Sequence, residues 1–243
     1  MRTLITGASS GLGAEMARQF AAKGHELALV ARRAARLAEL RDSLPGARVL
    51  VQALDVDDHD AVFRVFTELD DAIGGLDRVI VNAGIGKGAA IGTGRFDANK
   101  QTITTNLISA LAQCEAALSL FRARGRGHLV VVSSMSAMRG LPKAMTAYSA
   151  SKAGIATVAE GLRAELHGTP IKVTTLYPGY IRSEMNEQVA QRTPLMSSTE
   201  DGVRAMVRAI ERQVASAAVP AWPWRPLGLV LRHAPLSVIR RFA

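Results

Sequence analysis

Short apolar runs alternate with amphipathic helical patterns along the whole chain. The runs are apolar on successive residues, which is typical of strands buried on both faces of a parallel sheet. They predict seven strands, at residues 2–6, 26–31, 48–54, 77–82, 128–133, 171–177 and 217–220. This alternation predicts an α/β fold: a doubly wound, mostly parallel, seven-stranded Rossmann sheet with helices on both faces.

The helical patterns lie between the predicted strands. The first helix opens at Gly11, carries Leu12, Met16 and Phe20 at four-residue spacing, and ends near Gly24, a typical C′ residue. A second helix is predicted to follow Asp57, and three more are predicted at residues 98–123, 146–167 and 200–214. Irregular stretches are predicted at 84–97, at 183–198 and from 220 onward. No linker divides the chain, so residues 1–243 are predicted to form a single Rossmann-type catalytic domain with a substrate loop at about 183–198.

Composition narrows the class of protein. The 243 residues suit one large α/β domain, and 48% hydrophobic residues allow a sizeable core. The single cysteine, Cys114, excludes an intrachain disulfide and fits a reducing compartment. No Cys, His or carboxylate cluster has metal-ligand spacing, so no metal site is expected. Without a secretory signal or a bilayer-length apolar run, we expect a cytoplasmic protein.

The net charge of +9 is concentrated near the end of the chain. Residues 202–243 carry seven Arg and one acid, and these Arg do not alternate with aromatic residues along a groove, so nucleic-acid binding is not expected. The tail at about 220–243 mixes Trp, apolar residues and Arg, which suits peripheral contact with an acidic membrane. The alternative is that the tail packs on the domain, on a partner subunit or over the active site. Pro235 should interrupt any continuous helix there.

A glycine-rich segment, Thr6-Gly-Ala-Ser-Ser-Gly-Leu-Gly13, joins the first strand to the first helix. Glycine lets the backbone turn tightly and approach a phosphate, and the helix N-terminus presents free N–H groups to a pyrophosphate. The segment therefore predicts a dinucleotide site, against the alternative of a plain tight turn.

The residues after the second strand predict which dinucleotide binds. An acid there would bind the ribose hydroxyls of NAD, whereas a basic residue accommodates a 2′-phosphate. The chain has Arg32 and Arg33 and no acid, so NADP(H) is preferred over NAD(H), with Arg32 as the main phosphate ligand and Arg33 or Ser9 helping. Alternatively, the two arginines are the solvated start of a basic helix.

Tyr148 and Lys152 lie four residues apart in a predicted helix and so share one face. A free phenol is a poor acid–base catalyst at neutral pH, because its pKa is near ~10. A nearby cation favours the phenolate, so we expect Lys152 to lower the pKa of Tyr148. Alone, the pair is equally consistent with an amphipathic surface.

Taken in order, these segments resemble the classical short-chain dehydrogenase/reductase family over roughly residues 1–185. The matching motifs are Thr6-Gly-x-x-x-Gly11-x-Gly13, Asp55 after the third strand, Asn82-Ala83-Gly84 after the fourth, Asn106 in the fourth helix, Ser134 after the fifth strand, Tyr148-x-x-x-Lys152, and Pro178-Gly179 after the sixth.

The resemblance implies an NADP(H)-dependent oxidoreductase that interconverts a carbonyl and an alcohol. It implies that Tyr148 passes the proton, Ser134 hydrogen-bonds the substrate oxygen, Lys152 binds the nicotinamide ribose, and Asn106 holds a water linking Lys152 to solvent. Asp55 would accept a bond from the adenine amino group, with Val56 beside the ring. The implied cofactor site comprises Gly7, Ser9, Ser10, Gly11, Leu12, Gly13, Arg32, Arg33, Asp55, Val56, Asn82, Ala83, Gly84, Tyr148, Lys152, Pro178, Gly179, Ile181 and Ser183.

The catalytic serine departs from the family spacing. The family places it thirteen residues before the tyrosine, whereas Ser134 lies fourteen before Tyr148 and Ser136 lies twelve before it. Ser134 ends the apolar strand, as the family's serine does, so it is the first choice, and Ser136 is the reserve.

Substrate, assembly and function are less closely defined by the sequence. Apolar residues at the expected substrate segments favour a lipophilic carbonyl or alcohol, although core packing explains them equally well; they are Met135, Met138, Leu141, Pro142, Met145, Met185, Leu195 and Met196. The resemblance implies a homodimer or homotetramer through the fourth and fifth helices. Two other functions stay open: a non-catalytic NADP(H) sensor on the same fold, and a membrane-surface protein acting through its tail.

Overall fold

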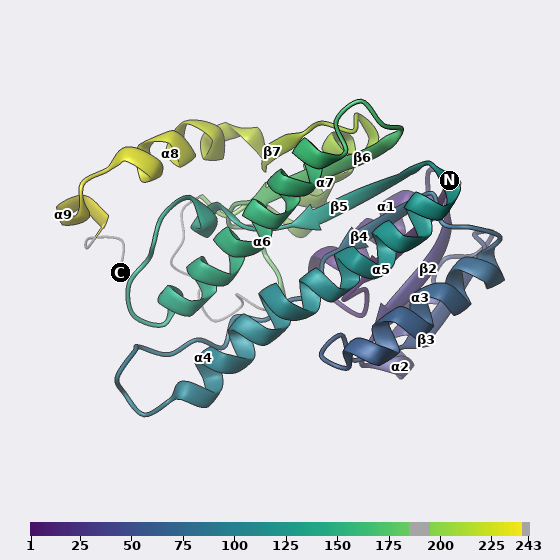
Figure 1. Ribbon diagram of the computed structural model, residues 1–243, viewed down its shortest axis with the longest axis horizontal. Helices are drawn as coiled ribbons and strands as arrows, with labels where there is room; N and C mark the ends of the chain where they lie inside the picture. The colour runs from purple at the N-terminus through teal and green to yellow at the C-terminus, as the bar shows by residue number, and fades with distance from the viewer. Residues whose placement is uncertain (185–194, 240–243) are drawn as a thin grey trace.

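A single parallel sheet forms the centre of the protein (Figure 1). The computed structural model describes residues 1–184 and 195–239. In this part of the chain seven strands pair in the order β3-β2-β1-β4-β5-β6-β7, and every pairing is parallel. The predicted fold class is therefore confirmed. The strands are β1 Arg2–Thr6, β2 Glu26–Ala31, β3 Val49–Ala53, β4 Arg78–Val81, β5 Gly127–Val132, β6 Ile171–Pro178 and β7 Ser216–Val219.

Helices cover both faces of the sheet, and each face has its own apolar core. The helices are α1 Gly11–Ala21, α2 Ala34–Asp42, α3 His59–Ile73, α4 Phe96–Ile103, α5 Ser109–Arg124, α6 Met145–Glu165, α7 Thr199–Glu211, α8 Ala221–His233 and α9 Leu236–Ile239. One core joins the sheet to α3, α5 and α6, which lie in front of the sheet in Figure 1. The other core joins it to α1, α2 and α7. No helix in the described ranges has the length and apolar character needed to cross a bilayer.

The strand order reverses beside β1, which pairs with β2 on one side and β4 on the other. Where neighbouring parallel strands lead to helices on opposite faces, their carboxyl ends leave a crevice that binds ligands. The glycine-rich segment follows β1 and Asn82 follows β4, so both lie at this switch point.

The predicted helix 98–123 is divided in the structure. A π-helical turn, η1 Thr104–Ile108, separates α4 from α5. In such a turn each backbone hydrogen bond spans one residue more than in an α-helix, and such turns are frequent at functional sites. Apolar periodicity does not reveal this turn, because the helix axis continues on both sides of it.

Two further regions differ from the sequence expectation. Residues 34–42 form α2, of which only Leu37 and Leu40 are buried, so the apolar pattern is too sparse to predict a helix. The region from 220 was expected to be irregular, but 221–233 form α8, whose prolines lie near its start, where a missing N–H is tolerated. The expected break at Pro235 is present between α8 and α9.

Candidate active site

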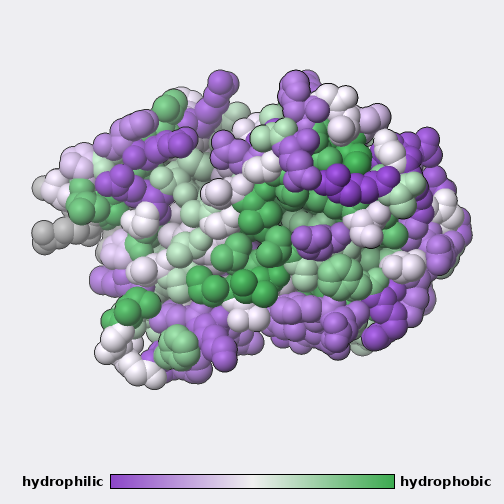
Figure 2. Space-filling model, in the orientation of Figure 1, coloured by the Kyte–Doolittle hydropathy of each residue, from purple (hydrophilic) through white to green (hydrophobic). Residues whose placement is uncertain are grey.

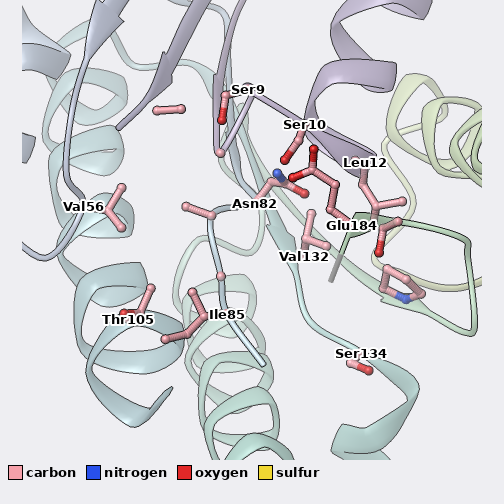
Figure 3. Close-up of a pocket in the computed structure, with 18 of the residues that line it drawn as sticks. Ser9, Ser10, Leu12, Val56, Asn82, Ile85, Thr105, Val132, Ser134 and Glu184 are labelled. Carbon is pink, nitrogen blue, oxygen red and sulfur yellow. The ribbon is translucent and has the colours of Figure 1, made fainter. Parts of the chain in front are cut away.

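A cavity of about 360 Å³ opens at the carboxyl ends of the strands (Figure 3). Every residue predicted to hold a dinucleotide lines this cavity, together with Ser134. Asn106 does not line it. The lining residues that sequence reasoning did not include are Ala31, Leu54, Asp57, Ile85, Thr105, Val132, Ser133 and Glu184.

The glycine-rich segment packs so closely that side chains are excluded. A Cβ on Gly13 would lie 2.3 Å from the Gly7 carbonyl oxygen, and one on Gly7 would lie 2.9 Å from Ala83 Cα. Gly7 also has a φ of +65°, in the left-handed region that favours glycine. These two glycines let the segment turn directly into α1, so the helix N-terminus faces the cavity.

Thr6 and Asn82 join the ends of β1 and β4 beside this segment. Thr6 Oγ1 accepts hydrogen bonds from the backbone N–H groups of Asn82 and Ala83, both at 3.0 Å. Asn82 Nδ2 donates to the Thr6 carbonyl oxygen at 2.8 Å. At the start of α1, the Ser10 side chain makes no capping bond, so it leaves the first N–H groups of the helix for an anion.

The two arginines after β2 point to different partners. Arg32 lies 3.9 Å from Asp55, and both side chains are about half exposed. Arg33 donates to the hydroxyls of Ser9 at 3.1 Å and Ser10 at 2.6 Å. The arginine that joins the glycine-rich segment is thus Arg33, which the sequence interpretation ranked as a helper to Arg32. Arg33 also directly precedes α2, so the position at a helix start, which the sequence offered as the alternative to phosphate binding, is compatible with contact to the glycine-rich segment.

Asn106 lies in the π-turn and is almost completely buried. Its amide donates to the Ile85 carbonyl oxygen and accepts from the Ile85 N–H, both at 2.8 Å. A Cβ on Gly84 would lie 3.0 Å from Asn106 Oδ1 and 3.4 Å from Lys152 Nζ. Asn106 therefore fixes the backbone after β4 close to Lys152, and a side chain at position 84 would have to push Asn106 aside by a few tenths of an ångström.

Asp57 performs a similar task on the other side of the cavity. Its carboxylate accepts hydrogen bonds from Thr105 Oγ1 at 2.8 Å and Ser109 Oγ at 2.7 Å. These bonds tie the segment after β3 to the π-turn. The sequence offered no strong signal for this role, because an acid two residues after Asp55 reads as an ordinary helix-start residue.

Tyr148 and Lys152 lie together on α6, as the spacing predicted. Lys152 Nζ lies 6.0 Å from the centre of the Tyr148 ring and donates to the Val132 carbonyl oxygen at 3.0 Å. Ser134 follows β5 and lines the same cavity as Tyr148, and its side chain acts to lower the pKa of the phenol. The reserve residue Ser136 has a buried hydroxyl without a hydrogen-bond partner among the described residues and does not line the cavity. The geometry therefore favours Ser134.

The expected lowering of the Tyr148 pKa by Lys152 is wrong for this state of the protein. Burial raises the pKa of Tyr148, the Ser134 side chain partly offsets the rise, and Tyr180 adds to it. Lys152 makes no resolved contribution because its ammonium is turned to the Val132 carbonyl. Burial in turn lowers the pKa of Lys152 to about 8. The pair is thus poised so that further positive charge near the phenol would favour proton release.

Comparisons with known proteins agree with this geometry. The family model described as short chain dehydrogenase matches residues 2–194. An uncharacterized oxidoreductase of Mycobacterium tuberculosis is 55% identical, with 100% of this chain and 97% of that protein aligned. An uncharacterized oxidoreductase of Myxococcus xanthus is 39% identical, over 89% and 86% of the two chains.

Solved structures share the fold over nearly the whole chain. The closed form of serine dehydrogenase complexed with NADP+ superimposes with a TM-score of 0.82 at 26% identity and covers 90% of this chain and 95% of its own. A short chain dehydrogenase/reductase from Burkholderia phymatum in complex with NAD gives a TM-score of 0.85 over 98% and 94% of the chains. At 20% identity, the second likeness shows the fold alone.

Proposed function

Because the chain belongs to the short chain dehydrogenase family, and so is an NAD(P)-dependent dehydrogenase/reductase acting on CH–OH and C=O groups, we propose a narrower function. The protein interconverts a lipophilic ketone or aldehyde and its alcohol, prefers NADP(H) over NAD(H), and uses Tyr148 as the general acid and base. The meeting of Ser134, Tyr148 and Lys152 in one cavity with the glycine-rich segment carries this proposal.

The residues present fit a dinucleotide. The glycine-rich segment excludes side chains where a pyrophosphate would approach, and the N-terminus of α1 is left without a side-chain cap. Asp55 and Val56 would hold the adenine, while Asn82, Ala83 and Gly84 would support the ribose side. Pro178, Gly179, Ile181 and Ser183 also line the cavity, and Ile181 would meet the nicotinamide carboxamide, as the resemblance implies. The bound nucleotide would supply or accept the hydride.

The protein's own residues would move the proton. In reduction, the Tyr148 hydroxyl donates its proton to the substrate oxygen, and in oxidation the phenolate removes it. Ser134 hydrogen-bonds the same oxygen and stabilises the charge that develops there. Lys152 would bind the nicotinamide ribose, and its ammonium together with the oxidised ring would favour the phenolate. Asn106 fixes the neighbouring backbone and, as the resemblance implies, would hold a water beside Lys152.

The basic residues after β2 support the preference for NADP(H). Arg32 and Arg33 line the cavity, and β2 ends at Ala31 without an acid that would bind ribose hydroxyls. The serine dehydrogenase relative in complex with NADP+ is in line with this choice.

The lipophilic substrate rests on a smaller set of residues than the sequence indicated. Met135 is buried and a Cβ on Gly228 of α8 would lie 2.7 Å from it, so core packing explains this methionine. Of that set, Met145 and Leu195 are exposed. Met185 lies in the part of the substrate loop outside the described residues.

A rate assay with a Tyr148→Phe variant tests the function. Ketones, aldehydes and alcohols are screened by the absorbance of the reduced nicotinamide, with NADPH and NADH in parallel. We expect turnover with NADPH to fall about 10³-fold in the variant while NADPH binding is retained. A wild-type protein that binds NADPH but turns over no substrate would favour the sensor alternative, and full activity in the variant would refute the mechanism.

A homodimer or homotetramer is the expected assembly. Hydrophobic residues gather over α5 and α6 on the face shown in Figure 2. Leu111 of α5 and Ile108, which directly precedes α5, are exposed. A Leu111→Arg variant should lower the mass measured by light scattering if this face joins subunits.

The described tail also supports peripheral membrane contact as a second candidate function. Trp222, Leu229 and Leu236 of α8 and α9 are exposed beside Arg225 and Arg232. Exposed apolar residues flanked by arginine suit the surface of an acidic bilayer. A Leu229→Ser, Leu236→Ser protein should sediment less with anionic vesicles than the wild type does, while Phe63→Ser on α3 serves as the control. Equal sedimentation of the wild type, the double variant and the Phe63→Ser control would refute the membrane role. The cytoplasmic location expected from the sequence stays a prediction.

A further inference from the structure

The Glu184 carboxylate forms ion pairs with Arg33 and Arg36, near the end of the cavity where the adenosine would bind. Glu184 follows β6, on the wall opposite α2, and its side chain extends toward Ser10 in Figure 3. Its carboxylate accepts a hydrogen bond from Arg33 Nη1 at 3.1 Å and a second from Arg36 Nη1. One acidic side chain therefore bridges two guanidinium groups across the opening of the site.

These contacts use the same donors that a phosphate group would need. The remaining nitrogens of Arg33 already bond the hydroxyls of Ser9 and Ser10, so Nη1 is the donor directed at an anion. Two guanidinium groups beside hydroxyls form a typical phosphate-binding set. The hydrogen bond from Arg36, and then that from Arg33, lowers the pKa of Glu184, which keeps the carboxylate ionised at neutral pH.

We propose that Glu184 is an internal competitor for the 2′-phosphate of the dinucleotide. Its carboxylate occupies Arg33 and Arg36 and leaves them when a 2′-phosphorylated ligand binds. NADH carries no such phosphate and does not need to displace it. Glu184 thereby reduces the affinity of the protein for NADPH and makes that affinity more similar to the affinity for NADH. This inference rests on the NADP(H) preference of the proposed function.

Calorimetric titration of a Glu184→Gln variant tests the competition. Each exposed ion pair shifts an equilibrium only severalfold, so the loss of both should tighten NADPH binding about three- to tenfold. The dissociation constant for NADH should stay within about twofold. Adenosine 2′,5′-bisphosphate should follow NADPH, because both carry the 2′-phosphate, and 5′-AMP should follow NADH, because neither carries it.

A Glu39→Gln variant provides the matched control. Glu39 lies on the exposed side of α2 and carries the same charge, without contacting Arg33 or Arg36 in the described structure. It should leave all four dissociation constants unchanged. If Glu39→Gln tightens NADPH as much as Glu184→Gln does, the effect is one of net charge and the competition is refuted.

Two further outcomes separate this inference from the cofactor proposal. If Glu184→Gln weakens NADPH binding, Glu184 orients Arg33 for the phosphate and the competitor role is wrong. If Arg33→Ala weakens NADPH but Glu184→Gln changes nothing, the cofactor preference stands and only the inference fails. If the wild type and Arg33→Ala both bind NADPH and NADH alike, the preference for NADP(H) itself fails.

Discussion

The two ends of the central strands bury polar groups in different ways. At the amino ends, Arg78 donates to His128 at 3.0 Å and to Glu211 at 2.7 Å, and His128 pairs with Thr174 at 2.9 Å. At the carboxyl ends, buried Lys152 donates to one backbone carbonyl among the described residues and otherwise faces the cavity. Polar side chains are buried at both ends, but among these described residues it is Lys152 at the carboxyl end that also faces a cavity where a ligand could bind.

This contrast distinguishes a structural polar cluster from a chemical one. Arg78 is 1% exposed and also lies over the Phe20 ring, so its guanidinium is surrounded by partners. Tyr148 and Ser134, in contrast, both line a cavity of about 360 Å³. A perturbed pKa therefore marks an active site here only when it accompanies a cavity, since His128 is also strongly perturbed and lines none of the cavities described.

The largest expected effect comes from removing Arg78 at the amino ends. An Arg78→Met variant leaves Glu211 and His128 without their donor, which should lower the free energy of unfolding by about 3 kcal/mol. Urea denaturation followed by circular dichroism measures this loss. Arg122→Met, which breaks an exposed pair with Glu165, should cost less than about 1 kcal/mol. A reduced kcat in the folded Arg78→Met protein would mean that the two ends are not independent.

At the carboxyl ends, Ser134→Ala should lower kcat about a hundredfold, because in the proposed mechanism Ser134 donates to the developing oxyanion. Its matched control is Ser136→Ala, which removes a buried hydroxyl that has no hydrogen-bond partner among the described residues. The control should retain kcat and stability, since no bond is lost. The opposite pattern in steady-state kinetics would transfer the role to Ser136.

The sequence predicted most of the sheet because buried parallel strands carry unbroken apolar runs. The predicted strands 2–6 and 26–31 coincide with β1 and β2. Helix α2 was missed because only Leu37 and Leu40 are buried on it, and α8 was missed because its prolines read as breaks. Apolar patterns in the sequence indicate which residues are buried, so they do not predict a helix that is mostly exposed. They also do not predict a helix whose first turns contain proline, because proline indicates a break.

The site residues also divide into those that local sequence patterns predicted and those that they could not. Motif spacing brought Tyr148, Lys152 and the glycine-rich segment to one cavity, because each lies at a fixed distance from a strand end. The direction of the Tyr148 pKa shift could not be predicted, since it depends on where Lys152 Nζ points and how much water is excluded. Glu184 could not be predicted either, because its partners lie about 150 positions earlier in the chain.

The amino-end cluster should also respond to acid. Burial lowers the pKa of His128 to about 3, so between that value and its unfolded value near 6.5 the unfolded chain binds more protons. Stability should therefore fall as the pH decreases, by about 2 kcal/mol between pH 7 and pH 5. Urea denaturation at both pH values measures the slope, and His128→Gln should abolish that part of it. An unchanged slope in the variant would assign the acid sensitivity to other groups.

The carboxyl end should instead respond to alkali, with the smallest effect of the four. Burial lowers the pKa of Lys152 to about 8. In the proposed mechanism Lys152 must be cationic to bind the ribose and to stabilise the phenolate, so carbonyl reduction should fall about tenfold by pH 9. Loss of folding would not explain this decline. The pKa of Lys152 is lower in the folded than in the unfolded chain, so above pH 8 the unfolded state binds more protons and this group's contribution to stability rises with pH. Initial rates at saturating NADPH, alongside thermal unfolding at each pH, separate the two quantities. A reduction rate that stays constant to pH 10 would show that Lys152 acts without its charge. The carboxyl-end cluster would then differ from the amino-end cluster only in being open to a ligand.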